Sequence, residues 1–376
     1  MRENEIRPED LSIDSLATLP IISKKTFASL SPEQYCDMRR ARQSVYDHTS
    51  GSTGRPLNFW FDWMSELRSF AITERIMRSV GTARLPVVYM RSRYRQGFTF
   101  RKHIWFFLRG FGSVQYRLRD LLDIGKRLHG KFILYGYTSS VVEVARQLRD
   151  AEESMPVAAV MATGENISPT SRALVEETLS SDFRMVYASR EAGWLAFECE
   201  YKTMHINEEW AYIEIVDSEG KRIPDGEEGR IIVTCFEARA MPLIRYDIGD
   251  RGVRNRSTCA CKRTLDTLHM SGREAEYIRF SNGYVVSLLD ISAAVDSFAG
   301  AVQQFQIILR GEADFLIRVI PGPLFDEVLD TLSELLTRTI HPSAQISWEK
   351  VESISEAESG KARYFIRETT NTHADI

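Results

Sequence analysis

The sequence predicts an α/β protein with two domains, and three observations carry that prediction. Short apolar runs alternate with amphipathic segments between residues 130 and 190, a pattern typical of a parallel sheet with helices on its faces. From Ala211 onward, apolar runs are joined by turn residues alone, which indicates an antiparallel β section. The chain has 376 residues, which is more than one compact core usually holds.

The α/β part is predicted from four segments. Residues 132–135 and 157–162 are short apolar strands, and residues 139–149 have helical spacing. In that helix we expect four side chains to be buried: Val142, Val144, Ala145 and Leu148. A second helix should begin after Ser168, because Pro169 suits the first helical position.

A smaller α+β unit is expected after Gly272. Residues 303–309 and 314–320 are typical of a hairpin about Gly311, and apolar residues recur with a helical period over 325–340. We therefore predict a large domain over residues 1–271, built of mixed sheets with helices and a β section. A small mobile C-terminal domain would follow over residues 272–376.

Composition excludes several classes of protein. The chain is 43% hydrophobic and 27% charged with a formal net charge of −4, so no nucleic-acid partner is expected. The short basic run of Arg91, Arg93 and Arg95 indicates a solvated face, with a role toward an anionic substrate as the alternative. The sequence holds no run of the roughly 18 apolar residues that a membrane span needs and no apolar core near its start, so a cytoplasmic protein is expected.

The loop Ser50-Gly51-Ser52-Thr53-Gly54 is the first candidate site. Its glycines let backbone amides approach an anion, and its hydroxyls add donors for phosphate oxygens. It lacks the spacing of a P-loop NTPase. A Ser/Gly hairpin turn is the alternative interpretation.

Four further candidates are single side chains that suit a nucleotide. Asp250 follows a β run and has a carboxylate that can accept both hydroxyls of a ribose; a turn-capping aspartate is the alternative. Tyr187 ends a predicted strand and can stack on adenine, while Glu191 lies four residues on and can hold Mg²⁺. Lys361 follows Gly360 and can bring a cation to a reacting phosphate, although most such lysines are surface residues.

Three cysteines and one histidine form a possible metal site. Cys199 and His205 lie six residues apart, and Cys259 and Cys261 form Cys-Ala-Cys. Three thiols and one imidazole satisfy a tetrahedral structural Zn²⁺. The alternative is two unrelated pairs of residues. Cys36 and Cys235 stay outside this set, and Cys235 follows an apolar run typical of the core.

Taken in order, these segments resemble the adenylate-forming superfamily, and within it the phenylacetate–CoA ligases and related capsular-polysaccharide biosynthesis proteins. The resemblance runs from about Leu16 to Arg367. Two positions differ from the usual family pattern: Ala188 replaces a glycine, and Arg190 replaces a small or aliphatic residue. Besides the loop and the Cys/His elements, it rests on residues 136–140, 163–165, 224–229, 241–246, 272–273 and 360–361.

The resemblance implies roles by position. Residues 50–54 would hold the ATP phosphates, and Gly164, Glu165 and Tyr187 would border the adenine. Glu191 would bind Mg²⁺, Asp250 the ribose, and Arg273 would lie at the hinge between the domains. Lys361, with Thr53 and Glu191, would act in catalysis.

The implied reaction begins with attack of a substrate carboxylate on the α-phosphorus of ATP. The products of this step are an acyl-adenylate and pyrophosphate, and a thiol (CoA or a carrier protein) or an amine then displaces AMP. A specialised biosynthetic ligase and a catabolic one both stay open. The alternative from another class is a non-catalytic nucleotide-binding or scaffold protein of the same fold.

Overall fold

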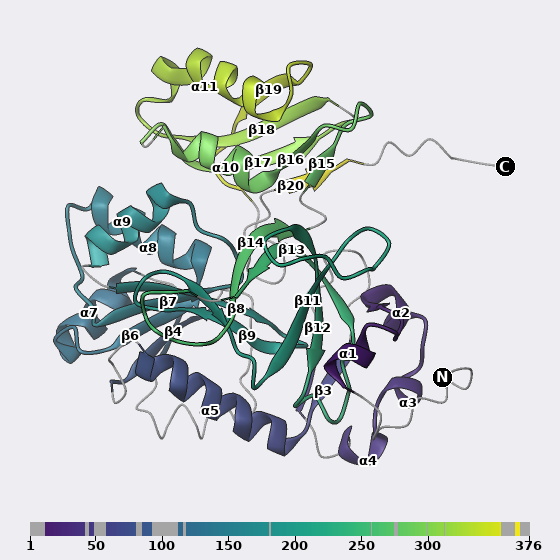
Figure 1. The fold of residues 1–376 in the computed structure, drawn as a ribbon. Coiled ribbons are helices and arrows are strands. Elements are labelled where there is room, and N and C mark those ends of the chain that lie inside the picture. Colours follow the sequence, from purple (N-terminus) through teal and green to yellow (C-terminus); the bar gives the residue numbers. More distant parts are fainter. Residues whose placement is uncertain are drawn as a thin grey trace. The chain divides into compact units, whose positions relative to one another are not determined.

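The structure is a computed structural model that describes most of the chain (Figure 1). The described residues are 12–41, 45–48, 58–79, 85–91, 112–115, 118–179, 182–256, 258–273, 277–298, 300–311, 313–354 and 365–368. They divide into two compact units, one from residues within 1–83 and 184–271 and one from residues within 84–183 and 272–376. The predicted boundary at residue 271 and the mobility beyond it stay predictions. Within the described ranges, no helix is long and apolar enough to cross a membrane.

The first unit begins with short helices and one longer helix. Its first elements are α1 (Ile13–Leu16), β1 (Ile22–Ser23), α2 (Lys24–Ala28), α3 (Pro32–Tyr35), α4 (Met38–Ala41), β2 (Val45–His48), β3 (Asn58–Phe61) and α5 (Trp63–Ser79). Strands β2 and β3 pair antiparallel on either side of the predicted phosphate loop. Arg245 anchors the opening segment, because its guanidinium donates to the carbonyls of Ala17 at 3.0 Å and Leu19 at 2.6 Å.

Seven strands of the first unit neighbour one another in the order β11-β12-β13-β14-β10-β9-β8, and β1 pairs parallel with β13. The pairs β11/β12, β12/β13, β9/β10, β10/β14 and β8/β9 are antiparallel, which confirms the predicted antiparallel section. Their bounds are β8 (Asp182–Ser189), β9 (Gly193–Glu198), β10 (Met204–Ile206), β11 (Ala211–Val216), β12 (Glu228–Cys235), β13 (Tyr246–Asn255) and β14 (Thr267–Arg273).

Strand β13 carries a bulge that matters for the site. Arg230 of β12 pairs with Arg251, but Ile232, only two residues on, pairs with Asp247. Three residues of β13 (248–250) therefore lie opposite Ile231 alone. Extra residues in one strand of a pair bend that strand and re-aim its side chains.

The second unit contains the predicted parallel sheet. Its strands lie in the order β7-β6-β4-β5, and each neighbouring pair is parallel. Helix α8 buries the predicted set of Val142, Val144, Ala145 and Leu148, and Pro169 opens α9 as expected. The elements are β4 (Val87–Arg91), β5 (Gly112–Gln115), α7 (Leu118–Leu128), β6 (Ile133–Tyr137), α8 (Thr138–Asp150), β7 (Ala159–Thr163) and α9 (Pro169–Leu179).

The described residues from Tyr277 onward form an α+β module with its own apolar core, as predicted. A four-stranded sheet has the order β19-β18-β17-β20, and α10 and α11 share an apolar core with it. The hairpin of β17 and β18 turns at Gly311, whose φ is +129°. The elements are β15 (Tyr277–Arg279), β16 (Val285–Ser287), α10 (Leu288–Asp296), β17 (Val302–Leu309), β18 (Asp314–Pro321), α11 (Phe325–Ile340), β19 (Gln345–Lys350) and β20 (Phe365–Arg367).

Candidate nucleotide and metal sites

Two segments of the first unit exchange tyrosine–carboxylate hydrogen bonds. The end of β8 and the turn after it supply Tyr187 and Glu191, and the start of β13 supplies Tyr246 and Asp250. The Tyr187 hydroxyl donates to Asp250 Oδ2 at 2.7 Å, and the Tyr246 hydroxyl donates to Glu191 Oε1 at 3.1 Å. Each segment therefore presents one tyrosine and, four residues on, one carboxylate to the other. The structure brings together three residues that the sequence predicts for the nucleotide.

Tyr246 is the member of this set that the sequence analysis missed as a site residue. Its ring is 1% exposed, and burial, together with the nearby charge of Glu191, raises the pKa of its hydroxyl far above the ordinary value. The hydroxyl therefore stays protonated and donates to the carboxylate. The available signal was the spacing, because Tyr246 opens the same Tyr-Asp-Ile-Gly-Asp segment that ends in Asp250.

A tight turn presents Glu191. Ser189 pairs with Gly193 across the β8/β9 hairpin, and the Ser189 hydroxyl accepts the backbone N–H of Ala192 at 2.9 Å. Gly193 has a φ of +72°, and a Cβ there would meet the Trp210 ring at 2.6 Å, so glycine is required. The Glu191 carboxylate is half-buried, with one oxygen held by Tyr246, which suits an oxygen ligand for Mg²⁺.

Gly164 and Glu165 lie in the second unit, directly after β7. Gly164 has a φ of +92° and turns the chain. Glu165 caps the beginning of α8, because its Oε2 accepts the backbone N–H of Ser139 at 2.9 Å and its backbone carbonyl accepts the Thr138 hydroxyl at 2.8 Å. The other carboxylate oxygen, Oε1, is buried and has no hydrogen-bond partner among the described residues. Such an acceptor suits a donor on a ligand.

Several predicted site residues are not brought into either arrangement. The loop Ser50, Gly51, Ser52, Thr53 and Gly54 lies outside the described residues, as does Lys361. Arg273 is exposed at the end of β14 and follows Gly272, whose φ is +114°. The roles assigned to these residues stay predictions.

The four predicted metal ligands converge in the first unit. One ligand atom from each of Cys199, His205, Cys259 and Cys261 lies within 4.8 Å of all the others. Cys199 Sγ is 3.6 Å from Cys259 Sγ, and Cys261 Sγ is 3.2 Å from His205 Nε2. Tetrahedral zinc with bonds of about 2.3 Å places sulfur ligands about 3.7 Å apart, so the separation of the two sulfurs fits a metal ion.

Two similar turns present the sulfurs. The Lys202 N–H donates to the Cys199 carbonyl and the Lys262 N–H to the Cys259 carbonyl, each at 3.0 Å. Both lysines have a positive φ, +58° and +61°. The conformation is uncommon for a residue with a side chain and costs of order 1 kcal/mol or more. The same uncommon conformation occurs in both cysteine segments, and both turns direct their sulfur atoms toward the cluster.

His205 is oriented by a hydrogen bond on its other nitrogen. Its Nδ1 lies 3.1 Å from the Leu265 carbonyl oxygen, which requires a proton on Nδ1 and leaves the Nε2 lone pair facing Cys261. Metal-bound histidines are commonly held in this way. The imidazole is fully buried, as is Cys199.

The electrostatics separate Cys259 from the other cysteines whose pKa is shifted. Burial raises the pKa of Cys259, but hydrogen bonds from Thr203 and the Cys261 backbone are among the causes that outweigh it and lower the pKa to about 6. For Cys199, burial prevails and raises the pKa. Burial also raises the pKa of Cys36, outside the cluster, to about 12. Metals bind thiolates, so the cluster and not Cys36 has a ligand poised to bind one.

Comparison with solved structures shows that the chain has the fold of the adenylate-forming ligases. A 2-hydroxyisobutyryl-CoA ligase, in complex with its acyl-AMP in the postadenylation state, superposes with a TM-score of 0.74 at 18% identity over 94% of this chain and 81% of that one. An amide bond synthetase from Marinactinospora thermotolerans gives 0.64 at 15% identity over 85% and 67%.

At the level of sequence, the chain is similar to a phenylacetate–CoA ligase from Thermus thermophilus. The two are 24% identical over 216 residues, which are 54% of this chain and 48% of the relative. The chain thus spans about half the length of the curated relative that it matches. No family model matches the chain. The predicted resemblance to the adenylate-forming superfamily is confirmed.

Proposed function

We propose that this protein activates a carboxylic acid with ATP through an acyl-adenylate. It then transfers the acyl group to a thiol, either CoA or a carrier protein, or to an amine. The observation that supports this proposal best is the reciprocal pair Tyr187–Asp250 and Tyr246–Glu191 in a chain with the fold of adenylate-forming ligases. Two carboxylates held by tyrosine hydroxyls on neighbouring segments suit a ribose and a metal-bound triphosphate.

Four sets of residues would contact the nucleotide. Asp250 would accept the ribose hydroxyls, since a carboxylate has lone pairs beyond the one that Tyr187 occupies. Glu165 has a buried acceptor oxygen without a described partner, which suits the exocyclic amine of adenine. Gly164 and the Tyr187 ring would border the base. The hydroxyls and amides of residues 50–54 would hold the phosphates.

The chemistry then requires mainly orientation and neutralisation of charge. A substrate carboxylate attacks the α-phosphorus, the bond to the bridging oxygen of pyrophosphate breaks, and pyrophosphate leaves. Thr53 and Lys361 would stabilise the charge that develops at the α-phosphate. Glu191 would hold Mg²⁺, which when bound neutralises charge on the phosphates. Arg273 would lie at a hinge that brings Lys361 to the site.

We further propose that the cluster of Cys199, His205, Cys259 and Cys261 holds a structural zinc ion. Support comes from the tetrahedral donor set, the two matched turns and the orienting bond on His205. Four protein ligands leave no position for substrate, and such closed sites stabilise the fold.

The direct test is ATP–pyrophosphate exchange across a panel of aryl, fatty and amino acids. At least one acid should promote exchange, and the same acid should support release of AMP when CoA, a thiol or an amine is added. The alternative, a non-catalytic nucleotide-binding protein, predicts that ATP raises the melting temperature while no acid promotes exchange. If ATP does not raise the melting temperature and no acid promotes exchange, both the ligase proposal and the nucleotide-binding alternative are wrong.

A further inference from the structure

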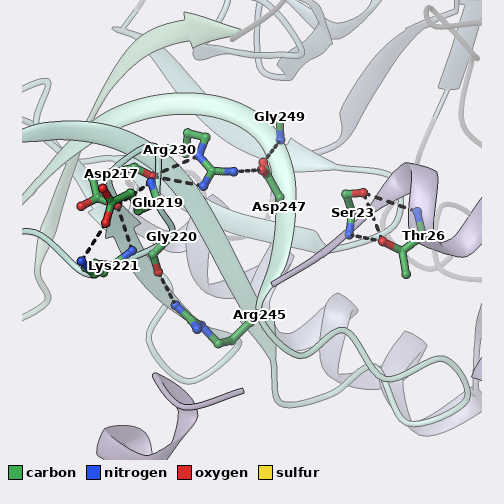
Figure 2. Close-up of polar contacts among 10 residues, drawn as sticks. All are labelled: Ser23, Thr26, Asp217, Glu219, Gly220, Lys221, Arg230, Arg245, Asp247 and Gly249. Carbon is green, nitrogen blue, oxygen red and sulfur yellow. Dashed lines mark hydrogen bonds and ion pairs between the residues drawn. The ribbon is translucent and has the colours of Figure 1, made fainter. Parts of the chain in front are cut away.

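The bulge that carries Asp250 is held by an ion pair directly beside it. Figure 2 shows the Arg230 guanidinium between the Asp217 carbonyl and the Asp247 carboxylate. Nε and Nη2 donate to Asp217 O at 3.3 and 3.1 Å, and Nη1 donates to Asp247 Oδ2 at 2.7 Å. A guanidinium fixed at three of its donors is a rigid support for the carboxylate that it contacts.

The Asp217 carbonyl is itself held in place. It lies in the turn after β11, where Asp217 Oδ1 accepts the backbone N–H groups of Glu219 and Lys221, each at 2.9 Å (Figure 2). The side chains of Arg230 and Asp247 are only 24% and 17% exposed, so their ion pair is partly shielded from water. Shielding strengthens a charge pair relative to one on the open surface.

Asp247 in turn contacts the backbone of the bulge. Its Oδ1 accepts the backbone N–H of Gly249 at 3.0 Å, a turn of aspartate onto the residue two positions on (Figure 2). Gly249 has a φ of +82°, which glycine adopts readily and other residues rarely. Asp250 follows at once, with its carboxylate against Tyr187 and 8% exposure.

We propose that Arg230 is a positioning residue for nucleotide recognition. Through Asp247 and Gly249, it sets the bulge so that Asp250 faces the ribose hydroxyls of ATP. This inference rests on the proposed function, in which Asp250 contacts the ribose. Arg230 itself touches neither nucleotide nor acid, and its effect should therefore be seen only in interactions that Asp250 makes.

The experiment compares the binding of ATP with that of 2′,3′-dideoxy-ATP, measured by calorimetry on the full chain without any acid substrate. The wild-type protein should bind ATP at least about tenfold more tightly, because hydrogen bonds to a charged group are involved. In Arg230→Gln the ratio of the affinity for ATP to that for 2′,3′-dideoxy-ATP should fall by about three- to tenfold. The affinity for the dideoxy nucleotide should stay the same, which a general loss of structure would not allow.

Two variants of Asp247 separate its contact with Arg230 from its contact with Gly249. Asp247→Asn keeps the oxygen that Gly249 needs but weakens the contact with Arg230, whereas Asp247→Ala removes both. The ratio should fall in Asp247→Asn and fall further in Asp247→Ala. Because Asp247→Asn is nearly isosteric, it also tests the proposal if Arg230→Gln does not fold.

The matched control is Arg251→Gln. Arg251 lies opposite Arg230 in the sheet, directly after Asp250, and pairs with Glu228 at 2.9 Å. Because its described ion pair is with Glu228 and not with Asp247, the ratio of the two affinities in Arg251→Gln should equal that of the wild type. An equal fall in Arg251→Gln, or an unchanged ratio in both Arg230→Gln and Asp247→Asn, overturns the positioning role alone. A wild-type protein that does not distinguish the two nucleotides overturns the assignment of Asp250 as well.

Discussion

The metal cluster and the tyrosine–carboxylate pairs lie in the same unit but differ in their chemistry. The cluster is a closed set of metal ligands, whereas the pairs hold carboxylates by hydrogen bonds from tyrosines. In the cluster, four ligand atoms converge within 4.8 Å, and a tetrahedral ion would occupy all of them. In the pairs, the Asp250 and Glu191 carboxylates each accept a tyrosine hydroxyl, and a carboxylate has several acceptor positions. A closed site contributes to stability, whereas a carboxylate can also accept hydrogen bonds from a ligand or bind a metal ion. The two sites should therefore respond to mutation in opposite ways.

The largest expected effect is loss of the metal cluster. Structural zinc contributes about 10–16 kcal/mol in small peptides, so Cys259→Ser should release the metal and lower the melting temperature by about 10 °C or more. ATP binding by the remaining folded protein should change little. Metal analysis and thermal unfolding measure both effects.

Cys36→Ser is the control for this comparison. Cys36 is a free cysteine outside the cluster, so its loss should leave the zinc content near one ion per chain. If freshly purified wild-type protein contains no zinc, the closed site is not a zinc site. If Cys259→Ser abolishes nucleotide binding while it stays folded, the division between the two sites fails.

The second prediction concerns Lys361, which the sequence assigns to the chemical step. Lys361→Ala removes a cation that acts where the carboxylate and the α-phosphate meet, so adenylation should slow by about 10²–10³-fold. ATP affinity should stay nearly unchanged, because the nucleotide would be held mainly by other residues. Transfer from a supplied acyl-adenylate should fall much less.

Rapid-quench measurement of the two half-reactions tests this separation. An equal loss in both half-reactions, or no loss in either, would mean that the loop around Lys361 does not act as the resemblance implies. Zinc content and melting temperature should match the wild type in either case.

The sequence predicted those parts of the fold that depend on periodicity. The spacing of apolar residues over 325–340 indicated α11 with the bounds that the structure has. The hairpin predicted from residues 303–309 and 314–320 about Gly311 matches β17 and β18 to within one residue at either end. The metal cluster was also predictable, because cysteine and histidine have few other reasons to occur in such pairs.

What the sequence did not reveal depends on register. Whether Asp247 pairs with Ile232 or with a residue further along β12 is decided by a bulge, and no periodic pattern encodes it. The contacts of Arg230 with Asp247 and of Tyr246 with Glu191 follow from that register. These supporting residues therefore came from the structure, although the carboxylates that they hold came from the sequence.

The third prediction tests Asp250 itself. Asp250→Asn keeps the size of the side chain but removes the charge that accepts the ribose hydroxyls. ATP affinity should fall by about 10- to 100-fold, the range for hydrogen bonds to a charged partner, and 2′,3′-dideoxy-ATP should lose much less. Calorimetry measures both affinities. An equal loss for the two nucleotides would mean that Asp250 does not contact the ribose hydroxyls.

The smallest expected effect is the loss of a single tyrosine hydroxyl, and it distinguishes the role of Tyr246 from that of Tyr187. Tyr246→Phe keeps the ring, which packs 5.9 Å from that of Phe27, and removes only the hydroxyl that holds Glu191 Oε1. A hydrogen bond of this kind contributes about 0.5–1.5 kcal/mol. If Glu191 holds Mg²⁺, the Mg²⁺ concentration for half-maximal adenylation should rise by about two- to tenfold, because the carboxylate is less well oriented. The preference for ATP over dideoxy-ATP should not change.

Tyr187→Phe is the reciprocal variant, because it removes the hydroxyl that holds Asp250. It should alter the preference for ATP over dideoxy-ATP and leave the Mg²⁺ dependence unchanged. Titration of both variants with Mg²⁺ and with the two nucleotides gives four measurements, and two of them should move. If each tyrosine changes both properties, the two carboxylates act as one site and not as separate contacts for ribose and metal. Zinc content should stay at the wild-type value in both variants, because neither hydroxyl contacts the cluster.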